Sequence, residues 1–117
     1  MIERVLSVCA LALAVAACAS QQAQYEWGPY EDTLFVHYHE PALKAESLSR
    51  YLEFLAQDNT YARPIAPGLF AEAGTFMLEQ GDAVRALEFY RLEYAAWPES
   101  RPMLEVLIRN LEERADG

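Results

Sequence analysis

The chain is poor in cysteine and in basic residues, and both shortages exclude functions. It has two cysteines, Cys9 and Cys18, and Cys9 lies inside an apolar N-terminal stretch, so no disulfide framework is expected. Nine Lys and Arg stand against 18 Asp and Glu, for a net charge of -9. A nucleic-acid binder needs cations to displace counterions, and a polybasic membrane contact needs them to attract anionic lipids. The sequence therefore argues against both.

Catalytic motifs are also missing. The chain contains no Ser-x-x-Lys, no Gly-x-Ser-x-Gly and no glycine run that could cradle a phosphate. Carboxylates for acid-base chemistry are available at Glu31, Asp32, Glu72 and Glu79, but no spacing holds two of them together. We therefore expect no enzymatic activity and no cofactor other than a covalent lipid.

A metal site is not expected either. The segment His37-Tyr38-His39-Glu40 offers two histidines, but residues two apart on a helix point about 200° from each other. The chain has no further histidine to complete a zinc site. We expect solvated or half-buried histidines here.

The longest apolar run covers residues 5–17. Its 13 residues are too few to cross a hydrocarbon core, which needs about 20, and they suit the apolar region of a secretory signal. Residues 1–17 are therefore expected to be a cleavable signal peptide, although the positive charge before the run is limited to the chain amine and Arg4.

The run ends in Val15-Ala16-Ala17-Cys18, which resembles the bacterial lipobox. The resemblance implies that Cys18 receives a lipid and becomes the first residue of the mature protein, while the alternative is an ordinary signal followed by a chance cysteine. Ser20, where aspartate would signal retention in the inner membrane, favours the outer membrane by similarity to Gram-negative sorting. Residues 18–26 then form a polar, lipidated tether, and the domain is held at the periplasmic face.

Residues 27–117 are expected to form an all-α domain of about five helices. Apolar residues at three- and four-residue spacing, with proline, glycine and capping residues between them, set the expected boundaries. The expected helices are Pro29–His39, Pro41–Gln57, Pro67–Gln80, Asp82–Ala96 and one that Ser100 caps, with a frayed end from Glu112 to Gly117. A loop is expected at Asp58–Ala66. The expected inward residues include Tyr30, Leu34, Phe35 and Tyr38 in the first helix, Tyr51 and Leu55 in the second, Phe70, Ala73 and Met77 in the third, Ala86 and Tyr90 in the fourth, and Leu104 and Leu111 in the fifth.

Residues 67–100 resemble a single tetratricopeptide repeat. Ala73-Gly74 matches the small pair where the two helices approach, and Gly81-Asp82 matches the turn between them. Glu93 departs from the pattern, because a small residue is usual there. The last helix is expected to act as a cap, since a lone hairpin cannot bury both of its faces.

A wider resemblance covers most of the mature chain. It rests on the stretch Tyr25-Glu26-Trp27-Gly28-x-Tyr30-Glu31-Asp32 and on the segments 67–72 and 97–100. These look like a family of short Gram-negative lipoproteins, domain of unknown function 4810. Members tend to be encoded beside two other envelope lipoproteins, one of them similar to the curli secretion lipoprotein. The resemblance implies such lipoproteins as partners in assembly.

The aromatic cluster Tyr25, Trp27 and Tyr30 is the candidate interaction site. Aromatic side chains could stack on a sugar, close the core, or carry a protein interface. We expect Tyr30 in the core and Trp27 at an interface of a protein-binding module. The alternatives are a small-ligand or glycan-binding lipoprotein, or an accessory regulator of a cell-wall enzyme.

Overall fold

The computed structural model describes residues 1–10 and 24–116. Residues 2–10 are helical and belong to the segment expected to be the signal peptide. The lipobox, Cys18, Ser20 and most of the expected tether lie outside the described residues. Among the helices that the structure describes, none combines the length and apolar character needed to span a membrane.

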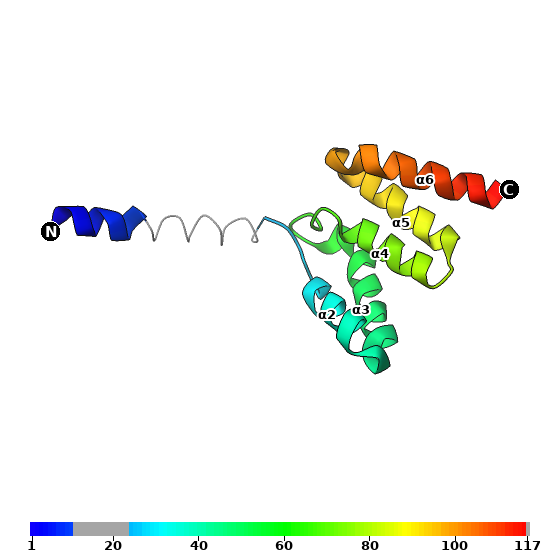
Figure 1. Cartoon of the computed structure of the whole chain (residues 1–117), viewed down its shortest axis with the longest axis horizontal. Helices are drawn as coiled ribbons and strands as arrows, with labels where there is room; N and C mark the ends of the chain where they lie inside the picture. Colours follow the sequence, from blue (N-terminus) through cyan, green and yellow to red (C-terminus); the bar gives the residue numbers. More distant parts are fainter. Residues whose placement is uncertain (11–23, 117) are drawn as a thin grey trace.

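The domain is all-α, as the sequence predicts (Figure 1). Within residues 24–116 there is no strand, and the one isolated bridge pairs Glu26 with Ile65. Short 3-10 turns lie at Pro41–Leu43, Asp58–Thr60 and Pro98–Ser100. The five helices of the domain are α2 (Tyr30–His39), α3 (Lys44–Ala56), α4 (Leu69–Glu79), α5 (Ala83–Ala96) and α6 (Arg101–Asp116).

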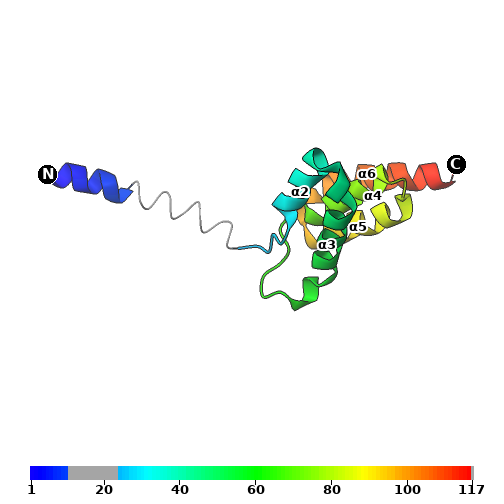
Figure 2. The same ribbon diagram turned by 90° about the horizontal axis from the view of Figure 1, so that it is seen from below.

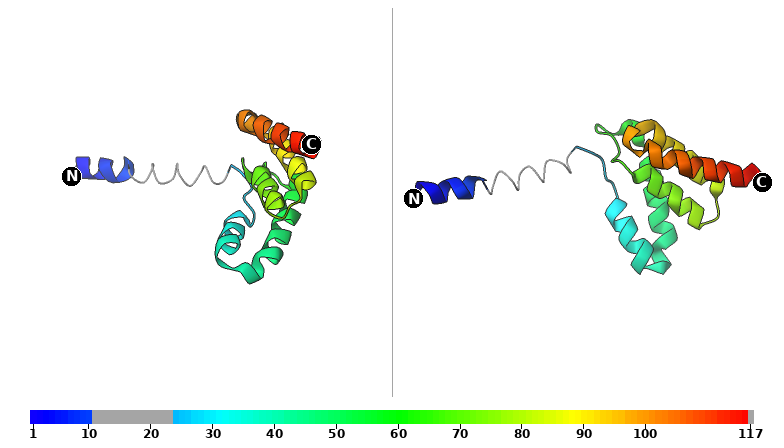
Figure 3. Two further views of the ribbon diagram at one scale, coloured as in Figure 1. Left: turned by 45° about the vertical axis from the view of Figure 1, so that its right-hand side comes forward. Right: turned by 45° about the horizontal axis from the view of Figure 1, so that its top comes forward.

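The helices form two groups that pack crosswise. Helices α4, α5 and α6 follow one another in antiparallel order, and the α2–α3 pair runs across them and contacts α4 through both of its helices (Figure 1). The connection from α3 to α4 loops out from the domain (Figure 2). Helix α6 lies along α5, as the right-hand view of Figure 3 shows. The core includes the fully buried side chains of Tyr51 on α3, Leu69 and Met77 on α4, and Leu104 on α6.

The α4–α5 hairpin follows from local signals. Gly81 takes a φ of +80°, a conformation that side chains disfavour, and Asp82 then caps α5 by accepting a hydrogen bond from the backbone N–H of Arg85 at 3.0 Å. Gly74 is the point of closest approach, since a Cβ built there would lie 2.7 Å from the ring of Tyr90. The hairpin therefore depends on glycine at both its turn and its contact.

We expect Gly74→Leu to lower the free energy of unfolding by about 1–3 kcal/mol or more, because the added side chain would overlap the buried ring of Tyr90. Urea unfolding followed by circular dichroism measures the change. Ala95→Leu, on an exposed position of α5, is the control and should stay within about 0.5 kcal/mol of wild type. Unchanged unfolding of the Gly74 variant would show that the two helices are not tightly packed there.

The expected inward face of the first helix is partly wrong. Phe35 and Tyr38 are 58% and 69% exposed, whereas Thr33 is buried and Tyr30 and Leu34 pack against the core. Helix α2 is apolar on more than one side, so spacing alone does not decide which stripe turns inward. The inward positions are therefore Thr33 and Leu34, one residue earlier than the expected Leu34 and Phe35. Thr33 can be buried because its hydroxyl donates a hydrogen bond to the carbonyl of Pro29 at 2.7 Å.

The expected fraying of the C-terminus is also wrong. Helix α6 continues to Asp116, and Leu111 near its end is buried. An ion pair between Arg91 on α5 and Glu112 on α6 joins the two helices at this level. Packing against α5 thus stabilises α6 beyond Glu112, where the sequence pattern predicts that the helix frays.

Candidate functional site

The backbone around Glu26 joins the N-terminal segment to the domain. The N–H of Glu26 donates to the carbonyl of Pro64 at 2.8 Å, and the N–H of Ala66 donates to the carbonyl of Glu26 at 3.0 Å. The carboxylate of Glu26 also pairs with Arg63 at 3.2 Å. The expected tether, 18–26, therefore ends in a segment that is fastened to the loop before α4.

The three candidate aromatic residues pack in two different places, one against Trp97 and two against each other. The Tyr25 ring packs edge-on against Trp97 at 5.5 Å between centroids. Trp27 contacts Tyr30 at 5.9 Å, and Tyr30 in turn contacts the buried Tyr51 at 6.2 Å. Trp27 is 36% exposed, and Tyr30 is half-buried against the core. The structure thus brings Trp27 and Tyr30 together and places Tyr25 elsewhere.

A hollow opens beside Trp27 at the start of α2. It has a volume of about 310 Å³ and is lined by Trp27, Gly28, Glu31 and Asp32. Gly28 is required by geometry, because its φ is +48° and a Cβ there would lie 2.5 Å from the ring of Phe54. Among the described residues, no ion pair engages Glu31 or Asp32. The hollow therefore combines an aromatic wall with two carboxylates that are available to a cationic ligand.

Glu93 occupies a structural position that sequence reasoning did not find. Its side chain is fully buried, and its Oε1 accepts hydrogen bonds from the N–H of Gly68 at 2.6 Å and from the hydroxyl of Ser100 at 3.3 Å. The carboxylate thereby connects the loop before α4, helix α5 and the start of α6. The spacing of the sequence could have revealed this burial, because Glu93 follows Ala86 and Tyr90 at intervals of four and three residues on the inward side of α5.

Two buried polar atoms have no hydrogen-bond partner among the described residues: the other oxygen of this carboxylate, Oε2 of Glu93, and Nε1 of Trp97. Glu93 lies in the last turn of α5, and Trp97 directly follows the helix and packs against the ring of Tyr25. Glu93, where the repeat pattern has a small residue, thus holds the loop before α4 against the end of α5.

The histidines do not come together. His37 pairs with Glu79 on α4 through Nε2 at 2.9 Å and contacts the ring of Phe76, whereas Nδ1 of the exposed His39 lies 2.9 Å from the carbonyl of Phe35. Within residues 1–10 and 24–116 there is no group of three potential metal ligands. His37 therefore serves to join α2 to α4.

The carboxylates considered for acid-base chemistry lie in two places. Glu31 and Asp32 line the hollow at the start of α2, and Glu72 and Glu79 are on α4. Burial raises the pKa of the Glu72 carboxyl, the nearby charge of Glu79 raises that pKa further, and His37 opposes the rise. Glu72 and Glu79 lie about two turns apart on one helix, and Glu79 lines a hollow between α2, α3 and α4 together with His37.

Comparison with known protein families identifies the family of the chain. The family model for the domain of unknown function DUF4810 matches residues 24–107, which include the N-terminal segment, the hollow at Trp27 and the hairpin. No curated protein and no solved structure matches the chain.

Proposed function

Because the chain belongs to the DUF4810 family, whose description assigns no activity, we propose a function from its sequence and geometry: an outer-membrane lipoprotein that binds other envelope lipoproteins from the periplasmic side. The proposed anchor is the lipid on Cys18. The proposed binding element is the domain surface around Trp27. The tetratricopeptide-like character of α4 and α5 belongs to the same proposal, since such hairpins commonly build protein-binding surfaces.

The observation that carries the proposal is the position of Trp27. It is an exposed aromatic side chain above a hollow with two carboxylates, and it follows directly after a segment that hydrogen bonds fasten to the domain. Residues 18–24, even fully extended at about 3.5 Å per residue, span only about 25 Å. A lipid on Cys18 would therefore hold Trp27 close to the membrane surface.

Proximity to the membrane favours a membrane-bound partner. A second lipoprotein on the same surface has a raised effective concentration, so a modest interface is enough for assembly. Tryptophan and tyrosine are the side chains that most often supply interface energy. A partner similar to the curli secretion lipoprotein fits these conditions, as the resemblance of the sequence implies.

The first experiment tests the anchor. Protein from membranes should begin at Cys18 and carry a diacylglyceryl thioether and an amide-linked acyl chain, as measured by intact mass. Cys18→Ala should accumulate as unprocessed or unanchored protein. Cys9→Ala is the matched control and should be processed normally, because Val8 before Cys9 does not fit a lipobox. An unmodified N-terminus at another residue in the wild type would overturn the anchor.

The second experiment tests the partner. The protein with its anchor intact is isolated by affinity purification, and we expect one envelope lipoprotein in a fixed ratio. Binding of soluble muropeptides without a protein partner would instead favour the glycan-binding alternative. A cell-wall enzyme as the stoichiometric partner would favour the regulator.

A further inference from the structure

A second hollow lies on the outer side of α2, next to the one at Trp27. It has a volume of about 260 Å³ and lies between α2, the turn at Pro41–Leu43 and α3. Four apolar residues, one serine and two charged residues line it: Pro29, Asp32, Phe35, Val36, Leu43, Ser47 and Arg50. Phe35 and Leu43 are 58% and 49% exposed, so their apolar atoms face water.

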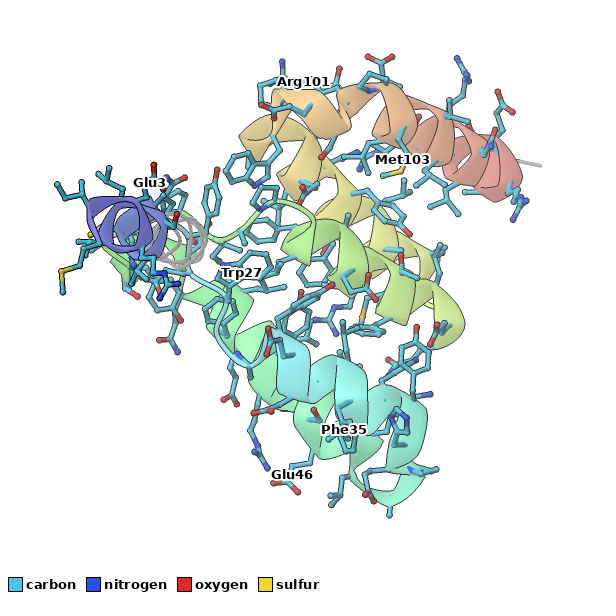
Figure 4. All side chains as sticks on the ribbon, turned by 60° about the vertical axis from the view of Figure 1, so that its left-hand side comes forward. Glu3, Trp27, Phe35, Glu46, Arg101 and Met103 are labelled. Carbon is cyan, nitrogen blue, oxygen red and sulfur yellow. The ribbon has the colours of Figure 1, made fainter. Side chains whose placement is uncertain are left out.

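Asp32 lines both hollows and makes them one continuous surface. We call this surface, defined by Trp27, Asp32, Phe35 and Leu43, the α2 face. Figure 4 shows Trp27 at the beginning of α2 and Phe35 further along the same helix. The ring of Phe35 stacks on that of His39, with 4.6 Å between the centroids and 16° between the planes. The face is therefore an exposed aromatic and aliphatic surface that includes the carboxylate of Asp32.

The charge of the α2 face is negative. Glu31 and Asp32 stand in the first turn of α2, and no ion pair within the described residues neutralises them. The one basic residue of the groove, Arg50, already pairs with Glu46. The chain as a whole carries -9, so long-range attraction also favours a basic partner.

We propose that the α2 face binds an amphipathic helix of a protein partner, with apolar side chains seated on Phe35 and Leu43 and a Lys or Arg on Asp32. This inference rests on the proposed function and specifies the chemistry of the partner. A groove between two helices is a common seat for an amphipathic helix, and its apolar anchors recur every three or four residues. Anionic lipid headgroups would be repelled by Glu31 and Asp32. A second copy that presented the same face is disfavoured as well, because it would bring the uncompensated carboxylates of both copies into one interface.

Synthetic helical peptides test the chemistry. The probe has leucines one turn apart with flanking lysines, and two further peptides replace either the lysines by glutamate or the leucines by serine. Each is labelled and titrated by fluorescence anisotropy with the protein as isolated from cells in neutral detergent, with detergent alone as background. We expect the leucine–lysine peptide to bind at least about 10-fold more tightly than either of the others. Equal binding of the three peptides would overturn the proposal.

Matched variants test the location. Phe35→Ser and Leu43→Ser should each weaken binding of the leucine–lysine peptide about 10-fold. Met103→Ser and Val106→Ser on α6, where the native side chains are 58% and 46% exposed, should change it by less than about 2-fold. Asp32→Asn should weaken binding and reduce its dependence on salt. Equal losses from the α6 and α2 variants, with folding verified by circular dichroism, would show that the face does not bind the peptide.

Two further measurements test the other possible occupants of the α2 face, a membrane and a second copy of the chain. If wild-type protein binds phosphatidylglycerol vesicles or associates with itself, and Phe35→Ser abolishes either, the face contacts a membrane or a second copy and the protein-helix assignment is wrong. A lipoprotein partner that still co-purifies with Phe35→Ser would leave the proposed function intact and overturn this inference. Peptide binding at the α2 face without any co-purifying lipoprotein would overturn the proposed function alone.

Discussion

Replacing Tyr51 with alanine is expected to lower the free energy of unfolding by about 3–5 kcal/mol, the range for large aromatic truncations in a core. Tyr51 is fully buried, and its ring contacts Tyr30 on α2 and Phe76 on α4. Its hydroxyl donates to the carbonyl of Leu69 at 2.6 Å. The side chain thus joins the α2–α3 pair to α4, and urea unfolding followed by circular dichroism measures its loss. A change below about 1 kcal/mol would show that the two groups of helices do not depend on this contact.

Tyr51→Phe separates the ring from the hydroxyl. It keeps the ring contacts and should cost only about 1 kcal/mol, the net value of one hydrogen bond. Burial raises the pKa of the Tyr51 hydroxyl well above its ordinary value of 10.0, and the nearby Tyr30 and Glu72 raise that pKa further. Above pH 10 the unfolded chain releases this proton while the folded chain keeps it, so the stability of the wild type should fall as the pH rises. The fall should be smaller in Tyr51→Phe, and equal pH dependence in the two proteins would contradict the assignment.

Replacing Trp27 with alanine is expected to abolish co-purification of the partner while leaving the fold nearly unchanged. Interface tryptophans commonly contribute 2 kcal/mol or more, which corresponds to about a 30-fold loss of affinity. Trp27 is partly exposed, and its ring contacts that of the half-buried Tyr30, so the free energy of unfolding should change by less than about 1 kcal/mol. The amount of partner recovered and the urea midpoint are measured on the same preparation.

Tyr30→Ala provides the comparison. Tyr30 lies between Trp27 and the buried Tyr51, so its truncation should destabilise the domain by more than that of Trp27. If Trp27→Ala destabilises the domain as strongly as Tyr30→Ala, Trp27 belongs to the core. If neither variant changes folding or co-purification, the aromatic cluster serves neither purpose and the partner docks elsewhere.

The α4–α5 hairpin was predictable from the amino-acid sequence because its determinants are local. Gly81 and Asp82 form the turn and the cap within a few residues of each other, and the inward residues of α4 follow the expected spacing. The same reasoning placed the boundaries of α2 within one residue. It also identified the aromatic segment before α2 as the candidate site, although not the division of its rings between Tyr30 and Trp97.

Local patterns did not reveal which distant segments meet. The exposure of Phe35 depends on which apolar stripe of α2 meets the rest of the domain, and two stripes of nearly equal character were available. The buried carboxylate of Glu93 is tolerated because Gly68, 25 positions earlier in the chain, delivers an N–H to it. The pairing of Glu26 with the loop at Ile65 likewise joins segments far apart in sequence. Turns, caps and helical spacing act over a few residues and can be read along the chain, whereas the partner of a buried polar group and the outer face of a helix are decided only when the helices pack together.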